Sequence, residues 1–356
     1  MNSRLFSPIK FRELLLRNRI AVPPMCQYSA VDGFATDWHL VHYGSRAVGG
    51  AALIIQEATA VSPEGRITPA DLGLYADGQI EKLKQITTFV RQQGCVAAVQ
   101  LAHAGRKASC AVPWEGGKQL NEEAGGWRTM APSSIAFSPE DRLPLALDEE
   151  GIELIVENFR SAAARALRAG FEAVEIHAAH GYLIHQFLSP LSNTRQDRYG
   201  GSFENRIRLL LEIVGTVREV WPAHLPLFVR ISATDWAEGG WNPDEAVKLS
   251  KLLKQKGVDL MDVSSGGLIS DVRIPLAPGY QVPFAERIRR EAGILTSAVG
   301  LITGAEQAET ILERGEADLI LFGRASLREP YLAHQAAVDL DEEIAWPLQY
   351  VRAKMK

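Results

Sequence analysis

The sequence predicts a single α/β domain folded as a (β/α)8 barrel of the TIM type. Short apolar runs recur along the 356 residues, and each is followed by a longer amphipathic segment, which is the pattern of parallel βαβ units. Eight such runs follow one another without an obvious linker, and eight units favour a closed barrel over an open sheet. The alternative, a doubly wound sheet, would carry a glycine-rich phosphate turn after its first strand, and no such turn follows Met25.

We expect one barrel strand at each apolar run. The predicted strands are Arg19–Met25, Ala52–Ala58, Val96–Ala102, Ala173–Ala178, Leu227–Ala233, Leu260–Gly266, Leu295–Gly300 and Asp318–Gly323. Glycines precede several of these runs, as expected where the preceding helix ends. Helices are predicted between the strands, for example over Ile152–Ala169 and Ile207–Val220.

Two segments interrupt this alternation. Residues 108–132 contain Pro, Trp and Gly with little periodicity, and we interpret them as a lid insertion after the third strand. Residues 346–356 form a short basic tail that either frays or docks on a neighbouring subunit. The barrel itself is expected to span residues 1–356 as one domain.

Composition and charge argue against several functional classes. Lys and Arg number 38 and Asp and Glu 43, and the resulting net charge of −5 disfavours a nucleic-acid partner. The three cysteines contain no CxxC pair, which favours a reducing compartment over a disulfide framework or a metal cluster. Residues 1–10 show no signal-peptide pattern, and no apolar run approaches the roughly 18 residues of a membrane span. We therefore expect a cytoplasmic protein without a membrane partner.

Polar side chains share one face of several predicted strands. Glu175 and His177 alternate with apolar neighbours, and Arg230 and Asp262 do the same on later strands. If the apolar face meets the outer helices, these polar groups point into the barrel. They either satisfy one another as a polar plug or line the catalytic mouth, and their positions near the carboxyl ends of the strands favour the mouth.

The densest polar constellation is His177, His180 and Tyr182. Residues three apart face opposite ways on a strand, so both histidines can meet one ligand only if the strand ends between them, which Gly181 allows. The residues alone leave three uses open. The histidines bind a substrate oxygen, pack as core residues, or bind a metal with a third ligand from His103, His185 or Asp262, as in a metal-dependent barrel hydrolase.

A phosphate site is predicted at the ends of the last two strands. Gly300 and Gly323 end these strands, and glycine there lets backbone N–H groups approach a phosphate. Arg324 follows directly and adds a cation that can form a charge-assisted pair. The pattern favours a phosphorylated cofactor or substrate.

The motifs of this chain resemble those of the Old Yellow Enzyme family of FMN ene-reductases, and more narrowly its bacterial thermophilic-like (YqjM-like) branch. The most specific stretches are HAAHGYL and RYGGSFENR, and the resemblance extends over essentially the whole chain. The PWEGG stretch within residues 108–132 is similar to the loop of the xenobiotic reductase A type. Further matching stretches are LRNRIAVPPMCQYS, QLAHAGRKAS and LILFGRASLREP.

This resemblance implies a non-covalently bound FMN. The implied cofactor residues are Pro23, Pro24, Met25, Cys26, Ala58, Gln100, Arg230, Gly300, Gly323 and Arg324. Arg230 matches the arginine beside flavin N1, where a fixed cation stabilises the negative charge of the reduced flavin. Arg106 and Lys107 lie in a loop that is expected to close over the flavin. Cys95 and Cys110 match no functional position, and we interpret them as structural.

The resemblance also implies the reaction and its residues. It is a ping-pong reaction in which hydride passes from NADPH to FMN N5 and then to the β-carbon of an enal, enone, maleimide or nitroalkene. His177 and His180 hold the substrate oxygen, and Tyr182 protonates the α-carbon. Cys26 and Tyr28 are expected to contact substrate, and Arg352 to reach the active site of a neighbour in a homodimer or homotetramer. No metal is implied, and a flavin carrier without turnover is the non-enzymatic alternative.

Overall fold

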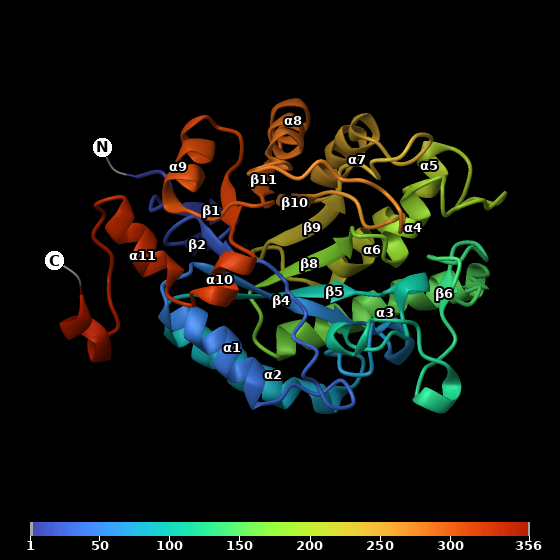
Figure 1. Cartoon of the computed structure of the whole chain (residues 1–356), viewed down its shortest axis with the longest axis horizontal. Coiled ribbons are helices and arrows are strands. Elements are labelled where there is room, and N and C mark those ends of the chain that lie inside the picture. Colours follow the sequence, from blue (N-terminus) through green and yellow to red (C-terminus); the bar gives the residue numbers. More distant parts are fainter. Residues whose placement is uncertain (1–2, 355–356) are drawn as a thin grey trace.

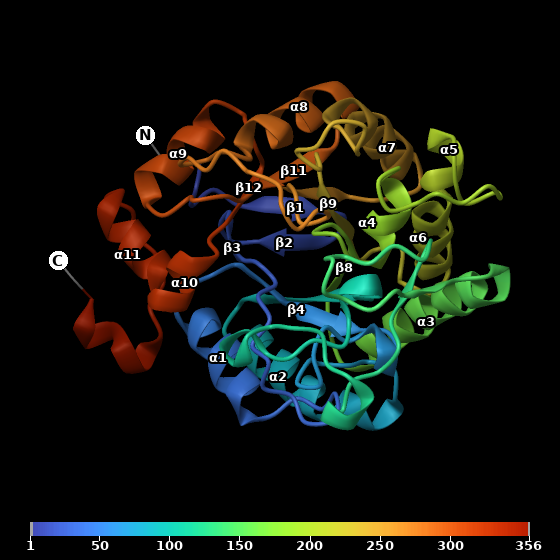
Figure 2. The ribbon, with the colours of Figure 1, turned by 45° about the vertical axis from the view of Figure 1, so that its right-hand side comes forward.

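The computed structural model describes residues 3–354, and within them eight parallel strands close into a barrel (Figures 1 and 2). The strand order around the barrel is β10-β11-β12-β3-β4-β5-β8-β9. Each barrel strand overlaps one of the eight predicted strands, so the predicted fold class is confirmed. The barrel strands are β3 (Ile20–Val22), β4 (Leu53–Ala60), β5 (Val96–Ala102), β8 (Ala173–Ala178), β9 (Leu227–Ser232), β10 (Leu260–Ser264), β11 (Leu295–Ala298) and β12 (Leu319–Leu321).

Helices surround the barrel, as Figure 2 shows. The helix α3 (Glu149–Arg168) begins where the Asp148 side chain accepts the N–H of Gly151, and it buries Ile152 and Phe159 against the strands. The predicted helices over 152–169 and 207–220 correspond to α3 and α6. The other α-helices are α1 (Asp37–Val48), α2 (Ile80–Gln92), α4 (Leu183–Leu188), α5 (Phe203–Arg206), α6 (Arg208–Val220), α7 (Pro243–Gln255), α8 (Val282–Ala292), α9 (Ala305–Glu313), α10 (Arg324–Arg328) and α11 (Leu332–Asp339).

The register of the strands brings the predicted polar residues together. Glu175 lies opposite Gln100 across β8 and β5, and Arg230 lies opposite both His177 and Asp262 across the next two pairs. All five side chains are buried. The polar interior predicted from strand alternation is therefore confirmed.

A short hairpin that the sequence did not reveal precedes the barrel. Its strands β1 (Ile9–Phe11) and β2 (Leu14–Leu16) pair antiparallel, and the Phe11 ring lies 5.2 Å from that of Phe228 at the start of β9. Ile9, Phe11 and Leu16 belong to one apolar cluster with residues that begin the barrel strands, such as Leu53 and Leu260. The hairpin thus closes the amino-terminal end of the barrel.

The segment between β5 and α3 contains the predicted lid insertion. Residues 108–132 include the 3₁₀ turns η4 (Pro113–Glu115) and η5 (Glu122–Ala124) and the strand β6 (Met130–Ala131), which pairs with β7 (Leu145–Ala146). Trp114 of η4 lies edge-on to Tyr28, with ring centroids 5.8 Å apart. Through this contact the insertion packs against the segment that follows β3. That the insertion acts as a lid stays a prediction. The other 3₁₀ turns are η1 (Pro63–Gly65), η2 (Asp77–Gln79), η3 (Gly105–Lys107) and η6 (Leu348–Ala353).

The carboxyl-terminal tail follows α11 on the outside of the barrel (Figure 1). The Trp346 ring lies 4.3 Å from the imidazole of His334, and that of Tyr350 lies 6.0 Å from Tyr331. Leu348 on η6 is 88% exposed. The tail is therefore packed where it leaves α11, and its docking on a neighbouring subunit stays a prediction. None of the helices within residues 3–354 is both long enough and apolar enough to cross a membrane.

Candidate active site

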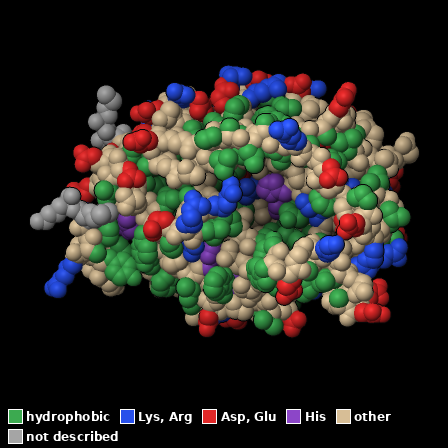
Figure 3. Space-filling model, viewed as in Figure 1, with side chains coloured by type: hydrophobic (Ala, Val, Ile, Leu, Met, Phe, Trp, Pro, Cys, Tyr) green, Lys and Arg blue, Asp and Glu red, His purple; other side chains and the backbone are tan. Residues whose placement is uncertain are grey.

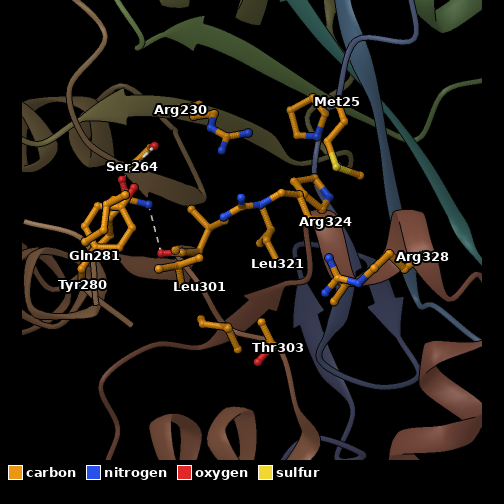
Figure 4. A pocket seen from close by; sticks show the side chains of 18 residues that line it. Met25, Arg230, Ser264, Tyr280, Gln281, Leu301, Thr303, Leu321, Arg324 and Arg328 are labelled. Carbon is orange, nitrogen blue, oxygen red and sulfur yellow. Dashed lines mark hydrogen bonds between the residues drawn. The ribbon is translucent and has the colours of Figure 1, made fainter. Parts of the chain in front are cut away.

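A cavity of about 480 Å³ lies at the carboxyl ends of the barrel strands (Figure 4). Seven of the predicted cofactor residues line it, namely Pro23, Pro24, Met25, Arg230, Gly300, Gly323 and Arg324. Arg230 lies on β9 and the others lie just beyond the ends of β3, β11 and β12, so residues far apart in the sequence meet at one end of the barrel. A volume of this size lies in the range of small-molecule and cofactor sites.

Arg230 reaches this cavity from the interior of the barrel (Figure 4). Its Nε atom lies 3.3 Å from Oδ2 of Asp262, and Oδ1 of Asp262 accepts the hydroxyl of Ser297 at 2.9 Å. Burial, followed by the charge of Asp262, raises the pKa of Glu175 well above its usual range, so Glu175 is neutral. Asp262 and Arg230 then form a balanced pair that holds the guanidinium in a fixed position.

The predicted phosphate cradle faces the same cavity. Gly300 has φ +120°, and a Cβ there would lie 2.9 Å from Nε2 of Gln281, so the turn after β11 requires glycine. Neither Arg324 nor Arg328 forms an ion pair with any residue in the range 3–354. Two cations one helical turn apart repel each other unless an anion lies between them, so the cradle fits a phosphate group.

Arg328 is a cavity residue that the sequence reasoning missed. It follows Arg324 by four positions and therefore lies on the same side of α10. The separation of four positions, typical of two residues on one side of a helix, is the signal that could have identified Arg328 from the sequence. Tyr280 and Gln281, which come from the turn before α8, were also missed because nothing local in their sequence marks them.

Two other predicted flavin contacts lie deeper in the barrel. Ala58 on β4 and Gln100 on β5 are buried and line neither this cavity nor the second one described below. The Nε2 atom of Gln100 donates to Oε1 of Glu175 at 2.8 Å. The contact of both residues with a flavin therefore stays a prediction.

His177, His180 and Tyr182 meet at the end of β8. The strand ends at Ala178, and His180 adopts a left-handed backbone with φ +57°. The ring of His177 consequently lies 5.2 Å from that of His180 and 5.0 Å from that of Tyr182. Gly181 allows this turn, because a Cβ there would lie 2.1 Å from the carbonyl oxygen of Gly267. In the view of Figure 3, His side chains lie beside Lys and Arg side chains in a central hollow of the surface.

Both histidines of this group are neutral hydrogen-bond donors. Burial, followed by the charge of Arg230, holds the pKa of His177 and of His180 well below the usual range. Nδ1 of His177 accepts the N–H of Ala179 at 3.3 Å, which leaves its proton on Nε2. Nε2 of His180 lies 2.7 Å from the hydroxyl of Ser264, which itself donates to Gln281 and so accepts from the imidazole.

Tyr182 keeps its proton and lies beside a cation. Burial raises the pKa of the Tyr182 phenol well above its usual range. The ammonium of Lys107 lies 5.1 Å from the centre of the Tyr182 ring and donates to the carbonyl oxygens of His180 (2.8 Å) and Gly267 (2.9 Å). Burial, followed by the charge of Arg106, lowers the pKa of Lys107 to about 8. Lys107 thus connects the turn that carries His180 to the loop after β10.

A second cavity, of about 520 Å³, lies between Tyr28 and the insertion. Arg106 and Lys107 line it together with residues of the insertion, among them Cys110. His177, His180 and Tyr182 line neither cavity, but Tyr182 contacts Lys107 of this cavity and His180 contacts Ser264 of the first, so the group lies between residues of the two cavities. Cys26 lies between Met25 of the first cavity and Tyr28 of the second. Its thiol has a raised pKa because of burial.

The candidate third metal ligands are bound to other groups. Nε2 of His185 lies 2.8 Å from Asp235, and Nδ1 of His103 accepts the N–H of Gly105. Asp262 contacts Arg230, as described above. Within residues 3–354, no group of three or more His, Cys, Asp or Glu side chains is arranged to hold a metal ion.

Arg352 lies apart from both cavities of its own chain. It is exposed on η6 and lines neither of them. Its entry into a neighbour's active site stays a prediction.

Comparison with known proteins gives matches over nearly the whole chain. The family model described as "NADH:flavin oxidoreductase / NADH oxidase family" matches residues 4–343. Two relatives named NADPH dehydrogenase, from Listeria innocua serovar 6a and Bacillus subtilis (strain 168), are 50% identical over 353 residues and 48% identical over 355 residues. Each of these alignments covers 99% of both chains.

Solved structures agree with these relatives. Morphinone reductase superposes with a TM-score of 0.80 at 30% identity, covering 98% of this chain and 92% of that one. The Old Yellow Enzyme homologue from Zymomonas mobilis superposes with a TM-score of 0.78 at 26% identity, covering 99% and 96% of the two chains.

Proposed function

Because the chain belongs to the NADH:flavin oxidoreductase / NADH oxidase family and is an FMN-dependent NAD(P)H oxidoreductase of the Old Yellow Enzyme type, we propose that it is an ene-reductase. The proposed substrates are activated alkenes, namely enals, enones, maleimides and nitroalkenes. The observation that carries the proposal is the pair of neutral imidazoles that meets the protonated Tyr182 between the two cavities.

The first cavity is the proposed FMN site. Gly300, Gly323, Arg324 and Arg328 would hold the phosphate, and Arg230 would offset the negative charge of the reduced ring. Ring contacts are proposed for Pro23, Pro24, Met25, Cys26, Ala58 and Gln100. When bound, FMN supplies the hydride chemistry that connects NADPH to the double bond.

The histidines and the tyrosine have separate proposed roles. His177 and His180 donate hydrogen bonds to the carbonyl or nitro oxygen, which draws electron density from the double bond and makes its β-carbon more electrophilic. For His180, the substrate oxygen replaces Ser264 as the acceptor at Nε2. Tyr182 holds its proton until the α-carbon becomes basic and then transfers it as a general acid.

The remaining predicted contacts lie toward the second cavity. Tyr28 lines it and Cys26 precedes it, so both are proposed to contact the part of the substrate that extends beyond the double bond. NADPH and the alkene are proposed to bind in turn at one site, and Arg352 is proposed to complete that site from a neighbouring subunit.

The proposal is tested with the purified protein under anaerobic conditions. We expect a yellow protein whose visible band is bleached by NADPH and restored by 2-cyclohexenone, N-ethylmaleimide or a nitroalkene, with one saturated product formed per bleaching cycle. If NADPH bleaches the band and none of these alkenes restores it, the ene-reductase proposal is wrong. The FMN-dependent oxidation of NADPH is observed in either case.

A further inference from the structure

A buried carboxyl group lies beneath the segment that connects the two cavities. Glu57 on β4 is 1% exposed and lies where the pairing of β4 with β5 shifts register, between Gln56 and Thr59. Its Oε2 atom accepts the backbone N–H of Gln27 at 2.6 Å, and its Oε1 atom accepts the hydroxyl of Tyr43 at 2.8 Å. The backbone N–H of Tyr28 also interacts with this carboxyl group.

Burial, and to a smaller extent the charge of Asp71, raises the pKa of Glu57 to about 8. A third N–H group points toward the carboxyl group without forming a hydrogen bond. Nδ1 of His39 accepts the N–H of Thr36, so the imidazole proton is on Nε2, which lies 3.5 Å from Oε1 of Glu57. Burial lowers the pKa of His39 to about 4, so this imidazole is neutral. Glu57 therefore serves as the common acceptor for a side chain of α1 and for the backbone of residues 27–28.

The segment held by Glu57 contributes to both cavities. Pro23, Pro24 and Met25 line the first cavity, and Tyr28 lines the second. Tyr28 has φ +50°, a left-handed conformation that a bulky side chain rarely adopts and that persists only where the surroundings impose it. The hydrogen bond from Gln27 to Glu57 lies directly before this residue.

We propose that Glu57 is a positioning residue whose buried carboxyl group fixes the backbone at Gln27 and Tyr28, and thereby sets the positions of Cys26 and of Tyr28, which lines the second cavity. The effect on substrate binding rests on the proposed function, whereas the fixing of the backbone does not. Glu57 touches neither cavity, so its role is exerted through the segment above it.

The test compares E57L with E57Q in the FMN-loaded protein. Both variants remove the ionisable carboxyl group and have similar volume, but only E57Q retains an acceptor for the N–H of Gln27. The first measurement is the rate at which iodoacetamide alkylates Cys26, followed by mass spectrometry so that Cys95 and Cys110 are counted separately. We expect E57L to be alkylated at Cys26 roughly tenfold faster than E57Q, because losing one buried hydrogen bond increases opening of the segment by about that factor.

The second measurement is the KM for the alkene at saturating NADPH. We expect a severalfold higher KM in E57L and a nearly unchanged KM in E57Q. Equal alkylation rates in the two variants would overturn the positioning role. If the wild-type protein reduces no alkene, the proposed function fails, and the alkylation rates still decide the role of Glu57.

A milder variant covers the case in which E57L does not fold. Y43F removes the hydroxyl that donates to Oε1 of Glu57 and leaves the carboxyl group in place. We expect faster alkylation of Cys26 in Y43F than in the wild type, by a smaller factor than in E57L. An unchanged rate in a folded Y43F protein would likewise count against the proposal.

Discussion

The two ends of the barrel differ in the side chains that point inward. At the amino-terminal end, Phe11 of the hairpin contacts Phe228 and belongs to one apolar cluster with Leu53, Leu260 and Leu319. At the carboxyl end, the same strands carry imidazoles, hydroxyls and a guanidinium. The apolar layer stabilises the barrel, and the polar layer holds the residues that are proposed to carry the chemistry.

This difference explains how the protein keeps so many polar groups in its interior. Burying Glu175, Asp262 and Arg230 is unfavourable, and three contacts in this layer offset part of that cost: Arg230 lies 3.3 Å from Asp262, Ser297 donates to Asp262, and Gln100 donates to Glu175. Because the hairpin closes the amino-terminal end of the barrel, a ligand can approach the polar layer only from the carboxyl end. Substitutions at the two ends should therefore change different properties.

The largest expected effect is on the polar end. We expect Y182F to slow restoration of the flavin band by the alkene by about 10²–10⁴-fold, because the general acid is removed. Bleaching by NADPH should stay close to the wild-type rate. Stopped-flow absorbance of the two half-reactions measures both. Equal slowing of the two half-reactions would show that Tyr182 has another role.

The matching change at the apolar end is F11A. Removal of a buried aromatic ring should lower the free energy of unfolding by about 3–5 kcal/mol. Urea denaturation of the FMN-loaded protein measures this loss. The rate constants of both half-reactions should remain unchanged at a temperature where the variant is folded. A large change in those rate constants would mean that the two ends are not independent.

The phosphate cradle should show an intermediate effect. R324A is expected to weaken FMN binding by roughly tenfold to a hundredfold, since a charge-assisted pair contributes about 1.5–3 kcal/mol. R328A, in the next turn of the same helix, should weaken it less. Fluorescence titration of the apoprotein with FMN gives both dissociation constants. If a variant with both R324A and R328A binds FMN as tightly as the wild type, these arginines do not hold the phosphate.

The smallest expected effect is a change with pH. Lys107 has a pKa lowered to about 8, so its ammonium is present below pH 8 and is lost as the pH rises through that value. Loss of this cation makes the nearby Tyr182 phenol a weaker acid, so the alkene half-reaction should slow severalfold above pH 8. In K107M the decrease centred near pH 8 should be absent. A decrease that persists in K107M would assign it to another group.

The strands and much of the site could be predicted from the sequence because their signals are local. Alternation within each strand revealed Glu175, Arg230 and Asp262, and a glycine at the strand end marked Gly300. The motif around His177 and His180 marked the group for which we propose a catalytic role. These patterns need only a few neighbouring residues to be read.

The rest depends on contacts between distant segments. The strands of the hairpin have three residues each, too few for a periodic signal, and they are recognisable only by their packing on Phe228. Lys107 acts on residues 73 and 160 positions away, and Glu57 on Gln27, 30 positions away. No pattern along the chain contains these pairs, since the barrel itself creates them.

The separation of the two cavities has a practical consequence for redesign. No residue lines both of them within the described part of the chain, and the insertion contributes only to the second. On the proposed function, we expect a library that varies insertion residues of the second cavity, such as Pro113, Lys118 and Gln119, to change the range of accepted alkenes and to leave the first cavity unaltered. We therefore expect selection for a new electron acceptor to leave FMN binding unchanged.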